Sequence, residues 1–208
     1  LINEIEERFL EETDYCQEAA NVTFFREHLN MDRVEIPQVY ADLCTDQVLC
    51  LSRLDGQPLN AWLKTNPSAR ERDDVAQLLE DVFIQSLYRL RCIHADPNPG
   101  NFLIQPPRTT DTGPAGCTLG LVDFGCVKRL EQPFIEQYQR LVTTAYEDDP
   151  EGFLEAMCSM GTLPKDADES LKEDIRQVFT RYGVWFRRLF AEEVFDFGQE
   201  KDFIKEGK

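Results

Sequence analysis

Two short segments of the chain carry side chains suited to phosphoryl transfer. The first runs His94-Ala95-Asp96-Pro97-Asn98-Pro99-Gly100-Asn101, and the second runs Leu121-Val122-Asp123-Phe124-Gly125. A carboxylate such as Asp96 can accept or orient the proton of an attacking hydroxyl group. Mg²⁺ prefers hard oxygen ligands, which the Asn101 amide and the Asp123 carboxylate would supply beside the phosphates of a nucleotide. These residues therefore predict a magnesium-dependent site with Asp96 in the catalytic position.

Regular elements must hold these segments in place. An apolar stripe with helical spacing runs through residues 68–92 and consists of Val75, Leu78, Leu79, Val82, Leu87 and Leu90. Residues 93–100 contain two prolines and a glycine, so we expect them to be irregular. Asn101–Ile104 and Leu119–Val122 are predicted to pair as a hairpin around the turn-rich stretch 106–116. This order of elements and motifs resembles protein kinases and predicts an α+β, protein-kinase-like fold.

Either segment alone carries little information. His-x-Asp occurs by chance, and we expect His94 to be a structural histidine that is hydrogen-bonded to backbone. Asp123 by itself could be a turn residue at the end of a strand. Both segments together, with a long apolar helix before them and a hairpin between them, favour the kinase-like arrangement.

The first segment closely resembles the His-Ala-Asp-Pro-His-Pro-Gly-Asn signature of the UbiB-like atypical kinases, a family associated with coenzyme Q biosynthesis. Residues 12–21 read Glu-Thr-Asp-Tyr-Cys-Gln-Glu-Ala-Ala-Asn and resemble that family's Glu-x-Asp-Tyr-x-x-Glu-Ala-x-Asn segment. The resemblance covers residues 10–130, and continues more loosely beyond. It implies an atypical kinase or ATPase that binds Mg-ATP and supports isoprenoid-quinone (ubiquinone) biosynthesis, with a lipid or a quinone-pathway small molecule as a further partner.

The resemblance also implies roles for individual residues. Asp96 would stand at the catalytic aspartate position, and Asn101 and Asp123 would be the magnesium ligands, with Asn101 also in the ATP-binding set. The hinge that meets adenine through backbone groups would be formed by Leu51, Ser52, Arg53 and Leu54.

Three acidic residues upstream are also given roles by the resemblance. Glu18 would be the helix glutamate that pairs with the ATP-holding lysine. Glu12 and Asp14 would form the family's Glu-x-Asp motif, which contacts an N-terminal Lys-x-Gly-Gln extension over the active site. Without the resemblance, we would assign Glu12 and Glu18 to a solvated acidic helix face.

The chain departs from the family pattern at several points. The lysine, the phosphate-covering loop and the Lys-x-Gly-Gln segment would all precede Leu1, so we expect an N-terminally truncated piece of a longer protein and assign activity to the intact protein. Asn98 stands where the family usually has His, and Ser52 stands where it often has Glu. Ala95 replaces the arginine with which many protein kinases read a phosphorylated activation loop.

Residues 126–130 lead almost directly into the next predicted helix, without a long activation loop or an Ala-Pro-Glu segment. Protein kinases use that loop to hold a peptide, so its absence favours a small-molecule kinase, an ATPase or a nucleotide-gated module. A kinase of the aminoglycoside or choline type stays open as an alternative, although it does not predict the upstream Glu-x-Asp-Tyr segment. A non-catalytic pseudokinase that acts as a binding module is the third hypothesis, which Asn98 and Ser52 favour.

The remaining pattern suggests two lobes. We expect residues 1–55 to be the remnant of an N-lobe and residues 56–208 to be a mainly helical C-lobe. Helices are predicted at 1–9, from Asp14 onward, and at 134–146, 150–160 and 171–190, with short strands at 37–40 and 47–52.

Composition excludes several other classes of protein. The 208 residues carry 39 acidic and 22 basic side chains, a net charge of −17, which argues against nucleic-acid binding and against electrostatic docking on anionic lipid. There is no apolar run long enough to span a membrane, so any membrane association would come from segments outside this chain. The seven cysteines contain no Cys-x-x-Cys pair, which fits free thiols in an intracellular, reducing compartment, either the cytoplasm or an organelle matrix.

Overall fold

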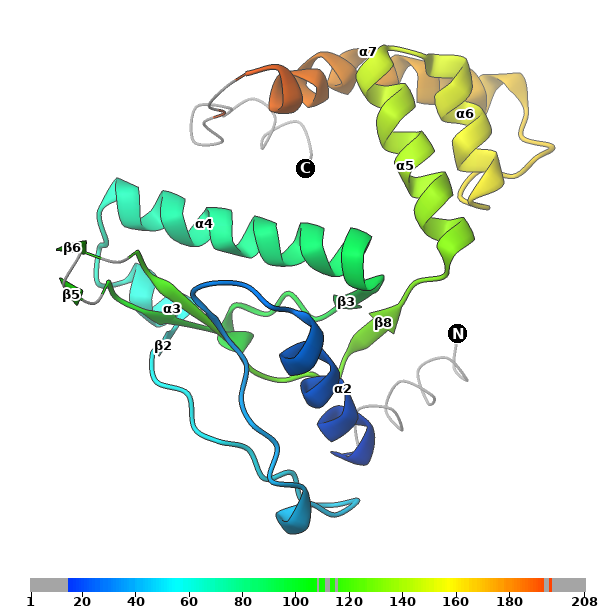
Figure 1. The fold of residues 1–208 in the computed structure, drawn as a ribbon. Coiled ribbons are helices and arrows are strands. Elements are labelled where there is room, and N and C mark those ends of the chain that lie inside the picture. The colour runs from blue at the N-terminus through cyan, green and yellow to red at the C-terminus, as the bar shows by residue number, and fades with distance from the viewer. Residues whose placement is uncertain (1–14, 108, 111–112, 115, 193–194, 196–208) are drawn as a thin grey trace. The chain divides into compact units, whose positions relative to one another are not determined.

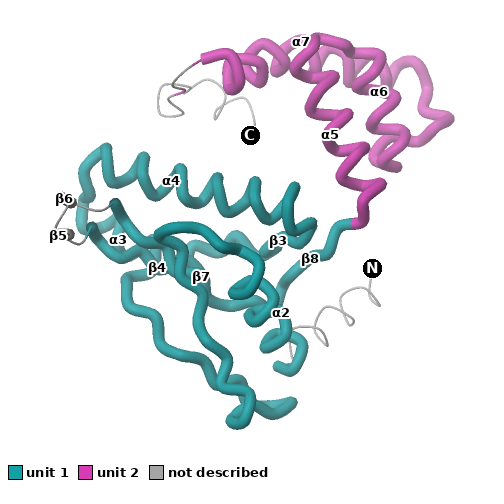
Figure 2. The backbone as a smooth tube through the Cα atoms, in the orientation of Figure 1, with its two compact units in different colours: residues 1–130 teal, residues 131–208 magenta. Residues whose placement is uncertain are grey.

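The computed structural model describes residues 15–107, 109–110, 113–114, 116–192 and 195 (Figure 1). The chain divides into two compact units, residues 1–130 and 131–208 (Figure 2). The boundary that the sequence suggested at residue 55 lies within unit 1, and the assignment of residues 1–55 and 56–208 to two lobes stays a prediction. The predicted helix at 1–9 and the predicted helix start at Asp14 lie outside the described residues.

Unit 1 is an α+β domain, as the sequence predicts. Its helices are α2 (Tyr15–His28), α3 (Leu59–Leu63), α4 (Ala69–Ile84), the 3₁₀-helices η1 (Ala41–Leu43) and η3 (Pro99–Asn101), and the π-helix η2 (Gln85–Leu90). Its strands are β1 (Val34–Glu35), β2 (Gln57–Pro58), β3 (Cys92–His94), β4 (Phe102–Gln105), β5 (Thr109–Thr110), β6 (Gly113–Pro114), β7 (Thr118–Leu121) and β8 (Val127–Arg129).

The largest sheet of unit 1 has the strand order β1-β7-β4-β2. Its centre is the predicted hairpin, in which β4 and β7 pair antiparallel with Phe102 opposite Leu121. Because the strands are antiparallel, the start of β4 and the end of β7 lie at the same end of the hairpin. A hydrogen bond from the Val122 N–H to the Asn101 carbonyl (3.0 Å) extends the pairing by one step. The hairpin therefore brings residues 94–101 close to residues 121–125, the two segments that carry the predicted catalytic and metal-binding residues.

The long helix predicted at 68–92 is confirmed from its start to Leu90, although its last turns are a π-helix and Cys92 belongs to a strand. Ser68 caps α4 through a capping box with Glu71, so the helix begins where the pattern indicated. After Ile84 the backbone continues as the π-helix η2, which ends at Arg91 in the left-handed conformation (φ 51°). Cys92 then begins β3, which pairs antiparallel with β8. Helical periodicity could not reveal this pairing, because it depends on a strand 35 residues further along the chain.

The strands predicted at 37–40 and 47–52 are present only as isolated bridges. Val39 pairs with Leu51 and Thr45 pairs with Val48, with the 3₁₀-helix η1 between them. The predicted segments therefore lie side by side, but the ladder between them is interrupted.

A single apolar core joins the elements of unit 1. α4 lies along the sheet (Figure 1) and buries three residues of the predicted stripe, Val75, Leu78 and Val82. The other main contributors are Val22, Phe25, Trp62, Ile104, Leu119, Leu121 and Phe124.

The described residues of unit 2 form three helices, close to the predicted ranges. They are α5 (Gln132–Glu147), α6 (Pro150–Ser159) and α7 (Glu169–Ala191). Phe153 and Phe179 pack with their ring centroids 5.0 Å apart and join α6 to α7. In the part of the chain that the structure describes, no helix is both long enough and apolar enough to cross a bilayer.

Candidate functional site

The loop before β4 is organised around the Asp96 carboxylate. The Asn101 Nδ2 donates to Asp96 Oδ2 at 2.8 Å, and the Asn98 N–H donates to Asp96 Oδ1 at 3.2 Å. The Asn98 side chain in turn accepts from the Gly100 N–H at 2.9 Å and caps η3. Since the amide nitrogen of the buried Asn101 is engaged with Asp96, the amide oxygen is the atom left to bind a cation.

Asp123 stands directly after Val122 at the end of β7 and has a left-handed backbone (φ 67°). Its Oδ1 accepts a hydrogen bond from the Gly125 N–H at 3.1 Å, which closes a tight turn. Asp and Asn adopt this conformation more readily than other non-glycine residues, because their short polar side chains bond locally to the backbone. The turn therefore suits the Asp-Phe-Gly sequence.

One cleft of about 840 Å³ collects three of the predicted acidic residues. Glu18, Asp96 and Asp123 all line it. The other residues that line it are Tyr15, Gln47, Val48, Leu49, Ala95, Val122, Gly125 and Cys126. Asp96 and Asp123 thus line the same cavity within unit 1, as a shared reaction centre requires.

Helix α2 holds the Asp-Phe-Gly turn through both backbone groups of Phe124. The Phe124 N–H donates to Glu18 Oε1 (3.2 Å), and the Phe124 carbonyl accepts from the buried Asn21 Nδ2 (3.0 Å). The fully buried Phe124 ring lies 5.1 Å from the Phe25 ring, centroid to centroid. Sequence reasoning gave no role to Asn21. The sequence did show a polar residue, Asn21, on the same face of the predicted helix as the apolar Val22 and Phe25. A polar side chain on such a face indicates a buried hydrogen-bond partner.

The environment of Glu18 disfavours its charge. Burial raises the pKa of Glu18 above its ordinary value, the hydrogen bond from Phe124 lowers it, and the negative charge of Asp123 raises it further. The net direction is upward. A cation placed in the cleft would offset the negative charge of Asp123 and so oppose the rise in the pKa of Glu18.

His94 is held by packing. Its ring lies 5.4 Å from the Phe124 ring and 6.0 Å from the Phe102 ring, centroid to centroid. Both ring nitrogens are buried, and neither has a hydrogen-bond partner among the described residues. The expected hydrogen bond to backbone was therefore wrong. The aromatic neighbours come from β4 and from the Asp-Phe-Gly turn, which the local sequence around His94 does not show.

The predicted hinge Leu51–Leu54 pairs with the preceding segment. The Ser52 N–H donates to the Gln38 carbonyl and the Gln38 N–H donates to Ser52 Oγ, both at 2.8 Å. Among the described residues, those of this region that line the cleft are Gln47, Val48 and Leu49. Contact of residues 51–54 with adenine stays a prediction. Glu12 and Asp14 lie outside the described residues.

The two predicted magnesium ligands have suitable donor atoms, although only Asp123 is among the residues that line the cleft and Asn101 is not. Within the described ranges no group of three or more His, Cys, Asp or Glu side chains could enclose a metal. The Asn101 amide oxygen and the Asp123 carboxylate supply hard oxygen donors. Mg²⁺ is commonly held in this way, by one or two protein groups together with substrate phosphates and water.

An Asp-x-x-x-x-Asn loop, an antiparallel hairpin and an Asp-Phe-Gly turn faced by a helix glutamate define a protein-kinase-like domain. The family model described as the ABC1 atypical kinase-like domain matches residues 1–157. The chain belongs to this family, which includes the UbiB and COQ8 proteins, and the predicted family and fold class are thereby confirmed.

Curated relatives come from plastids, mitochondria and bacteria. The chain is 25% identical over 195 residues to Protein ACTIVITY OF BC1 COMPLEX KINASE 8, chloroplastic, of Arabidopsis thaliana, covering 93% of this chain and 24% of the relative. It is 26% identical over 163 residues to Atypical kinase COQ8, mitochondrial, of Saccharomyces cerevisiae (78% and 30%). It is 27% identical over 123 residues to Probable protein kinase UbiB of Cronobacter sakazakii (59% and 22%). The chain thus spans about a quarter of the length of these relatives.

A solved structure shares the fold. The complex of Rv3197 with erythromycin from Mycobacterium tuberculosis matches with a TM-score of 0.66 and 23% identity, covering 94% of this chain and 50% of that one.

Proposed function

We propose that the protein binds Mg-ATP in the 840 Å³ cleft and acts as an atypical kinase or ATPase that supports isoprenoid-quinone biosynthesis. The observation that carries the proposal is the hydrogen bond from Asn101 Nδ2 to Asp96 Oδ2 (2.8 Å), at a cleft that Asp123 also lines. This bond fixes the Asp96 carboxylate and leaves the Asn101 oxygen for a cation.

Each residue then has a chemical task. Asp96 accepts or orients the proton of the attacking hydroxyl or water, and Asn101 and Asp123 hold Mg²⁺. When bound, the magnesium ion neutralises charge on the transferred phosphoryl group. Glu18 pairs with the lysine that other members of the family place in the upper lobe, and Leu51–Leu54 meet adenine.

The geometry after the Asp-Phe-Gly turn favours a small acceptor. β8 begins at Val127, two residues after Gly125, and α5 begins at Gln132. A peptide-binding activation loop has no room in so short a connection. We therefore assign the phosphoryl acceptor to a lipid, a quinone precursor or water. Relatives named as chloroplastic and mitochondrial support an organelle as the site of action, with membrane association through segments outside this chain.

A thermal melt of the intact protein, to which the activity is assigned, with and without Mg-ATP tests the proposal. Ligand at 100 times its dissociation constant adds about 2.7 kcal/mol of stability. For a domain of about 150–250 residues that corresponds to a rise in Tm of about 5–11 °C. The Asp123→Asn variant should lose the magnesium-dependent part of the shift, because it removes the charge.

Asp123→Asn is a mild substitution in other respects. Asparagine tolerates the left-handed φ of 67° and keeps an oxygen for the Gly125 N–H. Asp166→Asn is the matched control, since Asp166 is exposed in the loop between α6 and α7. No shift in a cooperatively melting protein at millimolar Mg-ATP would reject the proposal and favour a non-catalytic binding module. Transfer of phosphate to choline- or aminoglycoside-type substrates would favour the small-molecule kinase alternative.

A further inference from the structure

Cys44 and Cys50 flank a short turn in unit 1. The turn spans residues 45–49 and is closed by a hydrogen bond from the Thr45 N–H to the Val48 carbonyl (2.8 Å). The Cys44 Sγ accepts a hydrogen bond from the Cys50 N–H at 3.3 Å and lies 3.7 Å from the Cys50 carbonyl oxygen. One thiol is therefore already in contact with the backbone of the other cysteine.

This contact brings the Cys44 sulfur close to the Cys50 main chain. Because an N–Cα bond is about 1.46 Å long, the Cys44 sulfur lies within about 4.8 Å of the Cys50 Cα. Disulfide-linked cysteines have Cα atoms about 4.4–6.8 Å apart, and a cysteine side chain changes direction by rotation between staggered χ1 wells. A bond between these two residues needs side-chain rotation and a local adjustment of the turn.

We propose that Cys44 and Cys50 form a reversible disulfide, with a low-molecular-weight disulfide such as oxidised glutathione as the oxidant. The Cys44 thiolate attacks one sulfur of oxidised glutathione, breaks its S–S bond and releases one glutathione thiolate, which takes up a proton. The Cys50 thiolate then attacks the Cys44 sulfur of the mixed disulfide and releases the second glutathione thiolate, which is protonated in turn. Two protein thiols are oxidised, and oxidised glutathione is reduced to two thiols.

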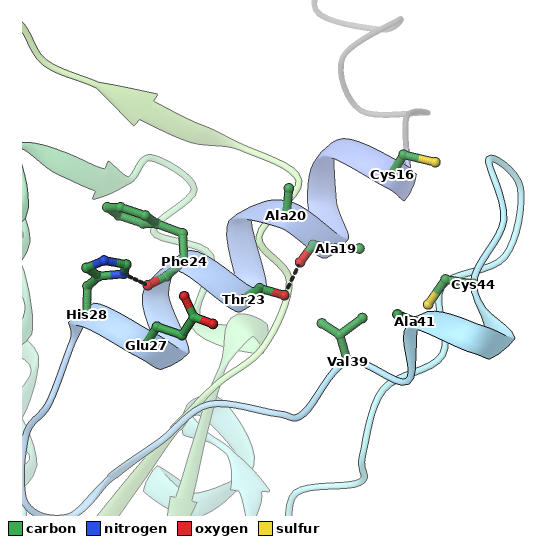
Figure 3. Close-up of a pocket in the computed structure, with 10 residues that line it drawn as sticks. All are labelled: Cys16, Ala19, Ala20, Thr23, Phe24, Glu27, His28, Val39, Ala41 and Cys44. Carbon is green, nitrogen blue, oxygen red and sulfur yellow. Dashed lines mark hydrogen bonds between the residues drawn. The ribbon is translucent and has the colours of Figure 1, made fainter.

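The surroundings distinguish this pair from the two buried cysteines, whereas Cys16, Cys126 and Cys158 are at least as exposed as the pair. Cys92 and Cys117 are fully buried, and burial raises the pKa of both thiols, which keeps them protonated and unreactive. Cys44 and Cys50 are both free thiols and only half-buried. Cys44 also lines a groove of about 520 Å³ beside α2, which gives a reagent access to its sulfur (Figure 3).

The consequence for nucleotide binding rests on the proposed function. Gln47, Val48 and Leu49, which the two cysteines flank, line the candidate nucleotide cleft. The Cys44 thiol also donates a hydrogen bond to the Tyr40 carbonyl at 3.3 Å, and a disulfide has no hydrogen to donate. Oxidation therefore removes one hydrogen bond from the segment that carries these lining residues. We expect the cross-linked protein to bind Mg-ATP with a measurably higher Kd than the reduced protein, because the cross-link restricts the segment that forms this side of the cleft.

Peptide mapping tests the disulfide directly. The chain is treated with oxidised glutathione, its remaining thiols are alkylated, and it is digested with a protease that cleaves before Asp46. A bond keeps the two cysteine-containing fragments joined, with a mass lower by two hydrogen atoms, until dithiothreitol separates them. Cys44→Ser and Cys50→Ser should each abolish the joined product. Cys158→Ser, in unit 2, is the matched control and should retain it.

Three products would overturn the proposal. They are alkylation of both thiols, a glutathione adduct that persists on Cys44, and a bond from Cys44 to Cys16, which lines the same groove. Mg-ATP affinity is measured on the intact protein in its reduced and its cross-linked form. Equal affinity of the two forms would refute the effect on binding. No binding by the reduced intact protein would refute the proposed function, while the mapping still decides the disulfide.

Discussion

Replacing Asn21 tests whether α2 holds the Asp-Phe-Gly turn. Asn21 Nδ2 donates a hydrogen bond to the carbonyl of the buried Phe124 (3.0 Å), and Asn21 Oδ1 accepts one from Gln17 Nε2 (3.1 Å). Asn21→Ala leaves a buried carbonyl without a donor, which costs about 1–3 kcal/mol. For a chain of this length the expected fall in Tm is about 2–12 °C. Since the turn carries Asp123, the Mg-ATP-dependent rise in Tm should shrink as well.

A second substitution gives the same prediction a pH signature. Asn21→Asp keeps the shape but sets a carboxylate oxygen against the Phe124 carbonyl. When the introduced carboxyl is protonated, its O–H restores a donor. Asn21→Asp should therefore be strongly destabilised at neutral pH and should approach the wild type as the pH falls.

The assay is differential scanning fluorimetry from acidic to neutral pH, with Gln17→Ala as the control. Gln17 is exposed, so its loss should change stability by about 0.5 kcal/mol or less. Two results would refute the reasoning. One is an Asn21→Ala melt equal to that of the control, and the other is a constant Asn21→Asp deficit across the pH range.

Two further predictions concern Glu18 and Gly116. A raised pKa means that the folded protein holds the Glu18 proton more tightly than the unfolded chain, so stability falls as pH rises from the ordinary value of 4.5 through the raised one. In metal-free protein Glu18→Gln should raise Tm at neutral pH and lose this advantage in acid. If Glu18→Gln raised Tm by the same amount at every pH, the raised pKa of Glu18 would not be the cause of the gain. Gly116→Ala should lower stability by about 1–3 kcal/mol, because a Cβ would overlap the Arg33 guanidinium and the Asp74 carboxylate, which are paired at 2.8 Å. An unchanged urea midpoint would show that this pair moves aside freely.

Local pattern was sufficient for the elements that surround the site. The apolar stripe of α4 and the apolar runs of β4 and β7 are visible within short windows of the sequence, so they predict a helix and two strands without tertiary information. Asp96 and Asp123 could be assigned to one cleft because the order of motifs is specific to a fold, whereas Glu18 could be assigned there only through the family resemblance. Asn101 was expected at the same cleft and is not among the residues that line it. Their catalytic and metal-binding roles are proposals that the experiments above test.

Features that depend on partners distant in the chain could not be predicted. Asn21 acquires its partner 103 residues later, and β3 exists only because β8 returns beside it. His94 shows the same limit. Its aromatic neighbours, Phe102 and Phe124, reach it through the tertiary fold, and nothing adjacent to His94 in sequence indicates that they replace a hydrogen bond.

The hairpin has a consequence for tolerance to insertion. The ligand candidates Asn101 and Asp123 flank its open end, while the chain reverses direction between Gln105 and Thr118 at the opposite end. The separation of the two ligands is set by strand register, which the length of the tip does not change. A peptide carried in this connection, away from the closely packed Gly116 and the buried Cys117, would therefore leave the spacing of the two ligand candidates unchanged.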